Sequence, residues 1–345
     1  ISDILVLKNN KGTEDNRVRK LDYSIQLSKL FYERFITNEE ISLFSPHDVP
    51  GLYDSFGTEG FDELYVKYEN DESVPRKTIG GQELILDLLK ERAETGRIYL
   101  MNIDHCNTHS SFVDKVEMSN LCQEITLPTK PIQHIDDENG EIALCILSAI
   151  NIGKIRDVSD FESLCDLSVR SLDELIDFQK YPVRAAEIAT KARRSLGVGF
   201  IGLAHYLAKQ GVKYDDPEAW KLVHDLTEAF QYQLVRSSVD LAKEKGACTY
   251  SDRTKYAQGI LPIDTYKKDV DELVSNDLKY DWESLREDVK KYGIRNSTLS
   301  AQMPSESSSV VSNATNGIEP PRGYLSIKKS KKGPLKQIVP QYNTL

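Results

Sequence analysis

An amide, a thiol and a carboxylate alternate along residues 119–125, as Asn120, Cys122 and Glu124. If this segment is extended, alternate side chains point to the same face, and these three line one wall while Leu121 faces away. A hydrogen-bonding amide, a sulfur and a proton acceptor on one small patch are typical of a reaction site. On spacing alone, the alternative interpretation is a small buried cysteine flanked by two surface polar residues.

The neighbours of Cys122 indicate which chemistry its thiol could do. Leu121 and Ile125 are apolar, and residues 117–127 contain no lysine or arginine. A thiol in such surroundings is not a low-pKa nucleophile. A neutral thiol is, however, a suitable hydrogen-atom donor. The prolines at 128 and 131 exclude a helix and a central strand just after this stretch, so we expect Cys122 on a loop that projects into a cavity.

A second candidate site is the turn formed by Pro304, Ser305, Glu306, Ser307 and Ser308. A predicted strand ends at this proline and a predicted helix begins after it. The first backbone N–H groups of a helix have no partner within it and can bind an anion, and serine hydroxyls add donors. The turn is therefore predicted to bind phosphate, with the alternative that Ser305 simply caps its own helix.

Longer motifs run in order over nearly the whole chain. They are Asn-Leu-Cys-Gln-Glu at 120–124, Gly-Glu-Ile-Ala-Leu-Cys at 140–145, Met-Pro-Ser-Glu-Ser-Ser-Ser at 303–309 and Asn-Ala-Thr-Asn-Gly-Ile-Glu-Pro-Pro-Arg-Gly at 313–323, with residues 43–52 and 260–266. In these motifs the chain resembles the large catalytic subunit of class I, aerobic ribonucleotide reductases. Such subunits are much longer and this chain starts with Ile1, so we expect an internal piece of the family's polypeptide.

The resemblance implies a role for each candidate residue. Cys122 becomes a thiyl radical that removes the 3′ hydrogen of a ribonucleoside diphosphate, Glu124 takes the 3′-hydroxyl proton, and Asn120 holds the sugar hydroxyls. Leu121 and the 304–308 turn complete the substrate site, with Ser307 where the family often has threonine. Cys145 is one of two cysteines that reduce the substrate and become a disulfide; its partner lies upstream of this chain. Without the family, Cys145 would be interpreted as a packed core cysteine.

The same resemblance implies the cofactors and partners. This chain is expected to bind no cofactor, because a metal-containing small subunit supplies the radical. ATP and deoxynucleotide effectors are expected to bind regions outside these residues. The expected partners are the small subunit, thioredoxin or glutaredoxin, and a second large subunit in a homodimer.

Composition narrows the class of protein. The net charge of −10 argues against a general nucleic-acid binder, which needs a basic surface. No apolar run is long enough for a membrane span, and no signal peptide opens the sequence. The five scattered cysteines do not form a secreted disulfide framework and favour a reducing cytoplasm.

Two further motifs match known binding patterns, but we expect neither of them to bind a ligand. His105, Cys106 and His109 could form half of a zinc site, but no second closely spaced pair accompanies them, and we expect no metal there. Residues 197–202 match the dinucleotide fingerprint, but they follow a predicted helix, so these glycines are expected to allow close packing of a helix that continues to residue 208. A metal-binding module and a non-catalytic piece of the same fold remain the alternatives to a reductase.

Hydrophobic spacing predicts helices over residues 21–35, 82–95, 159–178, 183–194, 219–245 and 281–292, and strands over 1–7, 97–103, 142–150 and 294–303. The strand holding Cys145 is expected to be buried on both faces. Residues 104–111 and 256–263 are predicted loops, and 326–336 a solvated hairpin. Alternating strands and helices give an α/β class. The resemblance implies part of a ten-stranded α/β barrel of two antiparallel five-strand halves with a central finger loop, as one catalytic domain over 1–345.

Overall fold

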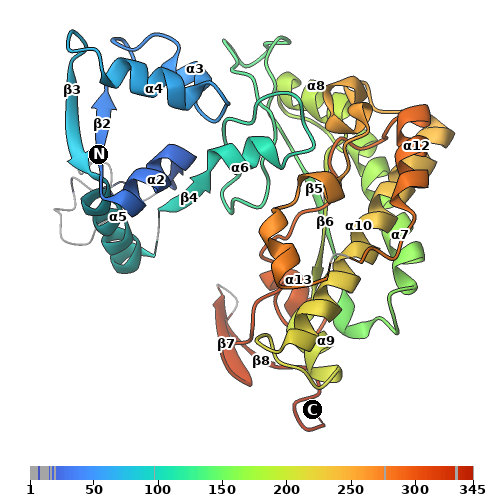
Figure 1. Ribbon diagram of the computed structural model, residues 1–345. Coiled ribbons are helices and arrows are strands. Elements are labelled where there is room, and N and C mark those ends of the chain that lie inside the picture. Colours follow the sequence, from blue (N-terminus) through green and yellow to red (C-terminus); the bar gives the residue numbers. More distant parts are fainter. Residues whose placement is uncertain are drawn as a thin grey trace. The chain divides into compact units, whose positions relative to one another are not determined.

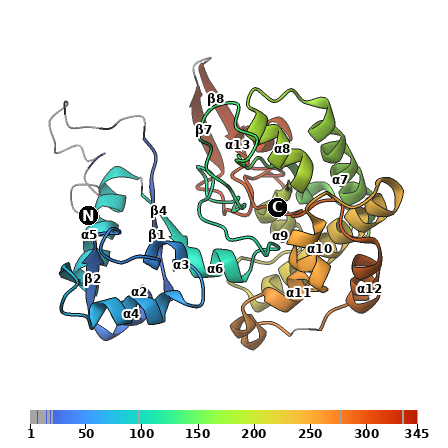
Figure 2. The ribbon, with the colours of Figure 1, turned by 90° about the horizontal axis from the view of Figure 1, so that it is seen from above.

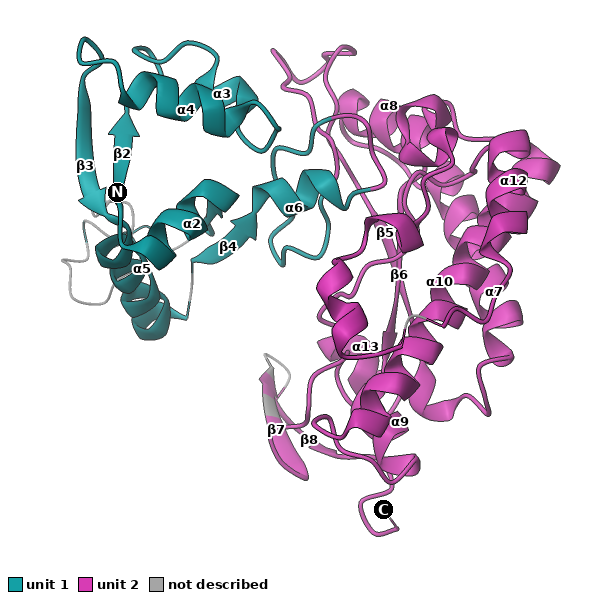
Figure 3. Ribbon diagram, viewed as in Figure 1, with its two compact units in different colours: residues 1–110, 115–126 teal, residues 111–114, 127–345 magenta. Residues whose placement is uncertain are grey.

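The computed structural model describes residues 7, 15, 18, 21–96, 98–275, 277–330 and 333–344. The chain forms two compact units, coloured separately in Figure 3. Unit 1 comprises residues 1–110 and 115–126, and unit 2 comprises residues 111–114 and 127–345. Both units combine helices with pairs of strands, as the predicted α/β class requires.

Unit 1 is built on two pairs of strands (Figure 1). Its elements are β1 (Ser24–Leu27), α2 (Lys29–Thr37), β2 (Glu40–Phe44), α3 (Leu52–Ser55), α4 (Phe61–Glu69), β3 (Arg76–Gly80), α5 (Gly81–Thr95), β4 (Tyr99–Asn102) and α6 (Ile103–Thr108). β1 runs parallel to β4, and β2 runs antiparallel to β3. Helices α2 and α5 bury Phe31, Leu84 and Leu88 in one apolar cluster with Leu27 of β1.

The single helix predicted over residues 21–35 is wrong in its first half. Residues 24–27 form β1, because they pair with β4 along their whole length. Ser28 then starts α2 as its N-cap, since its hydroxyl oxygen accepts the backbone N–H of Phe31 at 3.3 Å. Apolar spacing over so short a run fits a strand as well as a helix, and the partner strand decides between them.

The helix predicted over 82–95 and the strand predicted over 97–103 are confirmed as α5 and β4. Gly96 ends α5 with a φ of 63°. The loop predicted over 104–111 is wrong, because α6 follows β4 directly. Within α6, the side-chain amide of Asn107 donates to the carbonyls of Ile103 and Val116, both at 3.1 Å. A polar side chain thus ties this helix to the chain that follows it. Apart from Leu7, the strand predicted over 1–7 lies outside the described residues.

Unit 2 is organised around one parallel pair of strands. Its elements are β5 (Ile146–Asn151), η3 (Ile152–Lys154), α7 (Asp160–Phe178), α8 (Arg184–Arg193), β6 (Leu196–Ile201), α9 (Leu203–Lys209), α10 (Pro217–Lys245), η4 (Ser251–Arg253), η5 (Lys255–Gln258), α11 (Pro262–Thr265), η6 (Lys268–Glu272), α12 (Trp282–Tyr292), α13 (Glu306–Val311), β7 (Leu325–Ser330) and β8 (Gly333–Ile338). Helices α7 and α10 pack together, and α12 packs on α10 (Figure 2). The four long helices predicted in this unit are confirmed, as is the C-terminal hairpin, β7 with β8.

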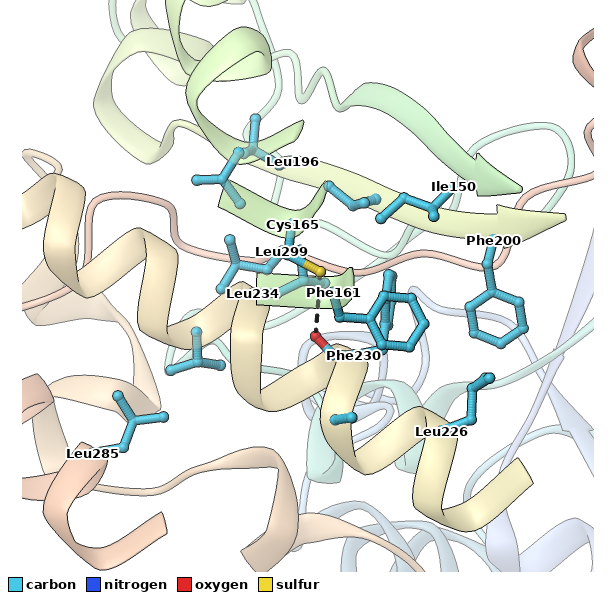
Figure 4. Close-up of a cluster of buried hydrophobic side chains, with 14 of the residues drawn as sticks. Ile150, Phe161, Cys165, Leu196, Phe200, Leu226, Phe230, Leu234, Leu285 and Leu299 are labelled. Atoms are coloured by element: carbon cyan, nitrogen blue, oxygen red, sulfur yellow. Dashed lines mark hydrogen bonds between the residues drawn. The ribbon is translucent and has the colours of Figure 1, made fainter. Parts of the chain in front are cut away.

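The core of unit 2 lies between β5–β6 and helices α7 and α10. Figure 4 shows its centre, where Phe161 and Cys165 of α7 meet Phe230 of α10. The Cys165 thiol is fully buried and donates to the carbonyl of Phe230 at 3.8 Å. Cys165 therefore serves as a small core residue, in the way expected of an inert cysteine.

Three predictions for the strands of unit 2 need correction. β5 begins at Ile146, directly after Cys145, and Leu147 on it is 42% exposed, so this strand is not buried on both faces. Residues 197–202 do not extend a helix: residues 196–201 form β6, a fully buried strand. Residues 294–303 do not form a regular strand either. They run beside β6 through single hydrogen bonds and one isolated bridge between Val198 and Ser300.

The loop predicted over residues 256–263 contains short helical turns, η5 and the start of α11. Among the helices of the described residues, none combines the length and the apolar character that crossing a membrane requires.

Candidate active site

The segment that carries Cys122 is a turn in unit 1, and the extended conformation considered for it is wrong. The backbone N–H of Asn120 donates to the carbonyl of Ile125 at 3.1 Å, and that of Gln123 donates to the carbonyl of Asn120 at 3.2 Å. Gln123 has a φ of 63°, which reverses the chain locally. Asn120, Cys122 and Glu124 therefore share one tight turn and not one face of a strand. The prediction that Cys122 lies on a loop is confirmed.

Asn120 closes this turn with its side chain as well as its backbone. Its Oδ1 accepts the backbone N–H of Ile125 at 3.2 Å, and its carbonyl accepts the hydroxyl of Ser119 at 3.1 Å. The residue is exposed. Because Oδ1 is engaged within the loop, the amide nitrogen is the group through which Asn120 could hold a sugar hydroxyl.

Cys122 is exposed at the tip of the turn, beside the exposed Leu121. Partial removal from water, and then the negative charge of Glu124, raise the pKa of the Cys122 thiol above its ordinary value. The thiol therefore keeps its proton at neutral pH. This is the protonated, accessible sulfur that hydrogen-atom transfer requires, and it agrees with the argument from its apolar neighbours.

Glu124 is half-buried, and one of its carboxylate oxygens is left unpaired. Oε2 is buried and has no hydrogen-bond partner in the part of the chain that the structure describes. Buried carboxylate oxygens are normally hydrogen-bonded, so an orphaned one marks a place where a ligand can donate. This oxygen belongs to a residue two positions from Cys122 in the sequence.

A pocket of about 270 Å³ adjoins this turn within unit 1. Its lining includes Ser119 and Gln123 of the loop and His105, Cys106 and His109 of the α6 region. The two imidazole rings meet edge to face, with centroids 5.4 Å apart. Within the described ranges, no group of three or more His, Cys, Asp or Glu side chains is placed to hold a metal ion.

Cys145 lies in unit 2, immediately before β5 and over the neighbouring strand β6. β5 and β6 are parallel, with Ile146 opposite Leu196 and Leu147 opposite Gly197. A Cβ atom placed on Gly197 would lie 2.9 Å from the Cys145 sulfur and 2.5 Å from the Leu147 side chain. Gly197 therefore provides the space that the thiol occupies. Cys145 is only partly buried, so the interpretation as a fully packed core cysteine does not hold.

The same glycine connects Cys145 to the serine turn. A Cβ atom on Gly197 would also lie 3.1 Å from the Cβ of Ala301, and one on Gly199 would lie 2.3 Å from the Ala301 carbonyl. The segment before Pro304, at Ala301, therefore packs directly on β6. The first two glycines of the fingerprint are buried in this strand, where they face protein and could not approach a bound pyrophosphate.

The serine turn lies at the start of α13 and lacks a side-chain cap. Ser305 is buried, and it makes no side-chain capping bond to α13. Its hydroxyl donates instead to the carbonyl of Met303 at 3.4 Å, so the capping interpretation is not met. The first intrahelical bond runs from the N–H of Ser309 to the carbonyl of Ser305 at 2.9 Å. The N–H groups of Ser307 and Ser308 consequently have no partner within this helix, and both residues are exposed.

Two residues that shape these sites receive no role from the sequence alone. Asn316 accepts the backbone N–H of Ser305 through its Oδ1 at 3.0 Å, which fixes the start of the turn. Gly197 makes room for Cys145. Asn316 lies in the 313–323 motif and Gly197 in the glycine pattern, so both stretches draw attention, but their roles require the pairing of distant segments.

Comparison with known proteins identifies the family of the chain. The family model of the ribonucleotide reductase barrel domain matches residues 1–344. The chain belongs to this family. Its α/β barrel is therefore the fold class, although the strands of the described residues form two-stranded pairs.

Curated relatives in the ribonucleotide reductase family are similar over the whole length of this chain. The alpha subunit of ribonucleoside-diphosphate reductase from Haemophilus influenzae is 60% identical over 348 residues, which cover 99% of this chain and 46% of the relative. The reductase 1 alpha subunit of Escherichia coli is 56% identical over 350 residues, covering 100% and 46%. That of phage T4 is 46% identical, covering 99% and 45%. The chain spans about half the length of these relatives.

Proposed function

We propose that this chain is the catalytic core of a ribonucleoside-diphosphate reductase large subunit, which converts ribonucleoside diphosphates to 2′-deoxyribonucleoside diphosphates. The observation that carries the proposal is the turn in unit 1. It combines an accessible thiol that keeps its proton, Cys122, with the unpaired carboxylate oxygen of Glu124. The names of the curated relatives and the family match support the same activity.

The proposed reaction assigns one step to each residue. The Cys122 sulfur, as a thiyl radical, takes the 3′ hydrogen atom of the ribose, and Glu124 accepts the 3′-hydroxyl proton. The 2′ oxygen leaves as water with one of the two protons of the cysteine pair. Cys145 and a second cysteine supply two electrons and two protons in all and become a disulfide, and the second proton goes with the new hydrogen on the 2′ carbon. Cys122 then returns a hydrogen atom to the 3′ carbon and is again a thiyl radical, and Glu124 returns its proton to the 3′ oxygen.

Binding is assigned to the remaining candidates. The amide nitrogen of Asn120 holds a sugar hydroxyl, and the backbone of Leu121 completes that wall of the site. Pro304 and Glu306 shape the serine turn, where the N–H and hydroxyl groups of Ser307 and Ser308 receive the diphosphate. Each good neutral hydrogen bond is worth about 0.5–1.5 kcal/mol in such a site.

We propose the partners that membership of this family implies. A small, metal-containing subunit supplies the radical, and this chain binds no cofactor of its own. Thioredoxin or glutaredoxin restores the thiols, the large subunit forms a homodimer, and ATP and deoxynucleotides act as effectors elsewhere on the subunit. A cytoplasmic location suits the five free cysteines.

The test is reconstitution of the complete large subunit with its small subunit and a dithiol reductant. Deoxynucleotide formation is expected, and Cys145→Ser should block multiple turnover while radical chemistry at Cys122 still decomposes substrate. Mild oxidation of the complete subunit should consume two thiols, one of them Cys145, as peptide mapping would show. A subunit that binds diphosphates and forms no deoxynucleotide would instead be a non-catalytic protein of the same fold.

A further inference from the structure

The loop that carries Cys122 belongs to unit 1 but is flanked in the sequence by segments of unit 2. Residues 111–114 belong to unit 2, residues 115–126 belong to unit 1, and the chain re-enters unit 2 at Leu127. We call residues 111–114 the outgoing limb and residues 127–130 the return limb. What holds these two limbs fixes where the loop begins and ends.

The outgoing limb is anchored along its whole length within unit 2. The hydroxyl of Ser111 donates to the carbonyl of Ser297 at 2.7 Å. Phe112 is buried and forms a β-bridge with Thr254, and the N–H of Val113 donates to the carbonyl of Arg253 at 2.9 Å. The limb is thus held by backbone contacts before it reaches Asp114.

The return limb is joined to the segment that leads to Cys145. Leu127 is buried, and Lys130 forms an antiparallel bridge with Glu141, through backbone bonds of 3.0 and 2.9 Å. Glu141 stands four residues before Cys145. The end of the Cys122 loop and the approach to Cys145 are therefore paired chain segments.

Arg193, the last residue of α8, links these limbs. Its Nη2 donates to the Asp114 carboxylate at 2.7 Å, and its Nε donates to the Glu141 carboxylate at 2.9 Å. The Arg193 guanidinium therefore binds Asp114 of the outgoing limb and also Glu141, which pairs with Lys130 of the return limb. Arg253 lies against the same two carboxylates at 3.7 and 3.4 Å, so the cluster has two positive and two negative groups.

The Arg193 side chain is fixed by its surroundings. It is 3% exposed, and its guanidinium carbon lies 5.8 Å from the ring centre of Phe112 and 5.2 Å from that of Tyr250. The N–H of Tyr250 in turn donates to the carbonyl of Ala192 at 3.0 Å. The guanidinium is thus buried between two carboxylates and two aromatic rings, and a lysine cannot reproduce its forked donor geometry.

We propose that Arg193 is a positioning residue for the reaction: it holds both limbs of the Cys122 loop in register with the segment that leads to Cys145. This inference rests on the proposed function. In the proposed reaction, Cys122 and Cys145 act on one substrate from separate chain segments. Arg193 is hydrogen-bonded to Asp114, next to the Cys122 loop, and to Glu141, on the segment that leads to Cys145. Arg193 touches neither cysteine and acts through Asp114 and Glu141.

The experiment compares Arg193→Lys with Arg194→Lys in the complete subunit, reconstituted with its small subunit. Arg194 is the matched control: it is the next residue, it is equally buried, and it pairs with Asp173 and Asp177, which belong to neither limb. Both variants keep the positive charge and replace the forked guanidinium with an ammonium group. The readout is the number of substrate molecules decomposed per deoxynucleotide formed, which does not depend on how much enzyme is folded.

Arg193→Lys should raise this ratio several-fold and lower kcat by about 10-fold or more with little change in KM, since misplacement by about 1 Å can cost about 10²-fold. Arg194→Lys should keep the wild-type ratio, even if less folded protein is recovered. If Arg193→Lys does not fold, Asp114→Asn tests the same link, because it removes the partner on the outgoing limb alone.

The outcomes separate the two proposals. Wild-type enzyme that forms no deoxynucleotide overturns the proposed function. Active wild type with an unchanged ratio in both Arg193→Lys and Asp114→Asn overturns the positioning role and leaves the proposed function intact. An equal rise in Arg194→Lys would mean that the ratio reports general loosening of unit 2, and it would also overturn the role of Arg193.

Discussion

Cys122 and Cys145 are held in different ways. The Cys122 turn is closed by bonds among residues 119–125, and its sulfur is exposed. The Cys145 sulfur lies over Gly197 of β6, far along the chain, and its place depends on the pairing of β5 with β6. In the proposed reaction, the thiol that meets the substrate therefore lies on a short turn closed by local bonds. The thiol that forms the disulfide is placed by the pairing of two strands.

Two of the other three cysteines are buried, whereas Cys106 is partly buried, as Cys145 is. Cys165 and Cys248 are buried in unit 2, and burial raises the pKa of the Cys248 thiol to about 11. Such thiols neither meet substrate nor exchange with a disulfide at neutral pH. Exposure therefore separates Cys122 and Cys145 from these two more clearly than sequence context does.

The largest effect is expected at the exposed sulfur. In the complete enzyme, Cys122→Ser should abolish turnover and leave substrate binding nearly intact, because an O–H bond is too strong for the hydroxyl to carry the radical. The measurements are deoxynucleotide formation and the dissociation constant of the diphosphate. Product above background in this variant would remove Cys122 from the mechanism.

The second largest loss of activity is expected from substitution of Glu124, two residues from Cys122. Glu124→Gln keeps the shape of the turn and removes the proton acceptor, and loss of a general base typically costs about 10²–10⁴-fold in rate. Steady-state kcat with unchanged substrate affinity is the measurement. A rate near that of the wild type would show that the 3′-hydroxyl proton leaves by another route.

The packing that places Cys145 can be tested at Gly197. Gly197→Ala puts a methyl group within 2.9 Å of the Cys145 sulfur, and overpacking of this kind costs about 1–3 kcal/mol of unfolding free energy. Denaturant unfolding measures it, with Gly60→Ala as the control, because a Cβ there meets no atom within 4 Å and, as at Gly197, φ is not positive. An unchanged stability for Gly197→Ala would mean that β6 can move away from Cys145.

A smaller effect is expected at the serine turn. Ser307→Ala and Ser308→Ala should each weaken diphosphate binding by about 0.5–1.5 kcal/mol, as loss of one neutral hydrogen bond does. The control is Ser312→Ala at the C-cap of α13, where the hydroxyl already donates to the carbonyl of Ser308 at 2.7 Å. Equal affinity for all three variants would exclude these hydroxyls from phosphate binding.

The smallest expected effect concerns the pKa of Cys122. The Glu124 charge raises this pKa, so Glu124→Gln should lower it and increase the thiolate fraction at any pH below the pKa. Iodoacetamide should then alkylate Cys122 faster in the variant than in the wild type at pH 7–8. The difference in rate should vanish at a pH where Cys122 is ionised in both proteins. Mass spectrometry follows the Cys122 peptide, with Cys106 in the same sample as the reference. Slower alkylation would contradict the electrostatic contact.

The sequence by itself determined the motifs, the family and the long helices. The amphipathic spacing in α5, α7, α10 and α12 is a local property, and so is the proline-bounded loop around Cys122. It also indicated the protonated thiol, since Leu121 and Ile125 are apolar and no basic residue lies close to Cys122 in the sequence.

Tertiary structure decided what depends on partners distant in sequence. Residues 24–27 are a strand because β4 lies beside them, and the glycines at 197 and 199 belong to a buried strand because Cys145 and Ala301 pack on them. Arg193 shows the same limit: α8 was predicted, but nothing local indicates that its last side chain binds Asp114 and Glu141. Periodicity records which residues are apolar, whereas pairing and burial are set by segments that only the folded chain brings together.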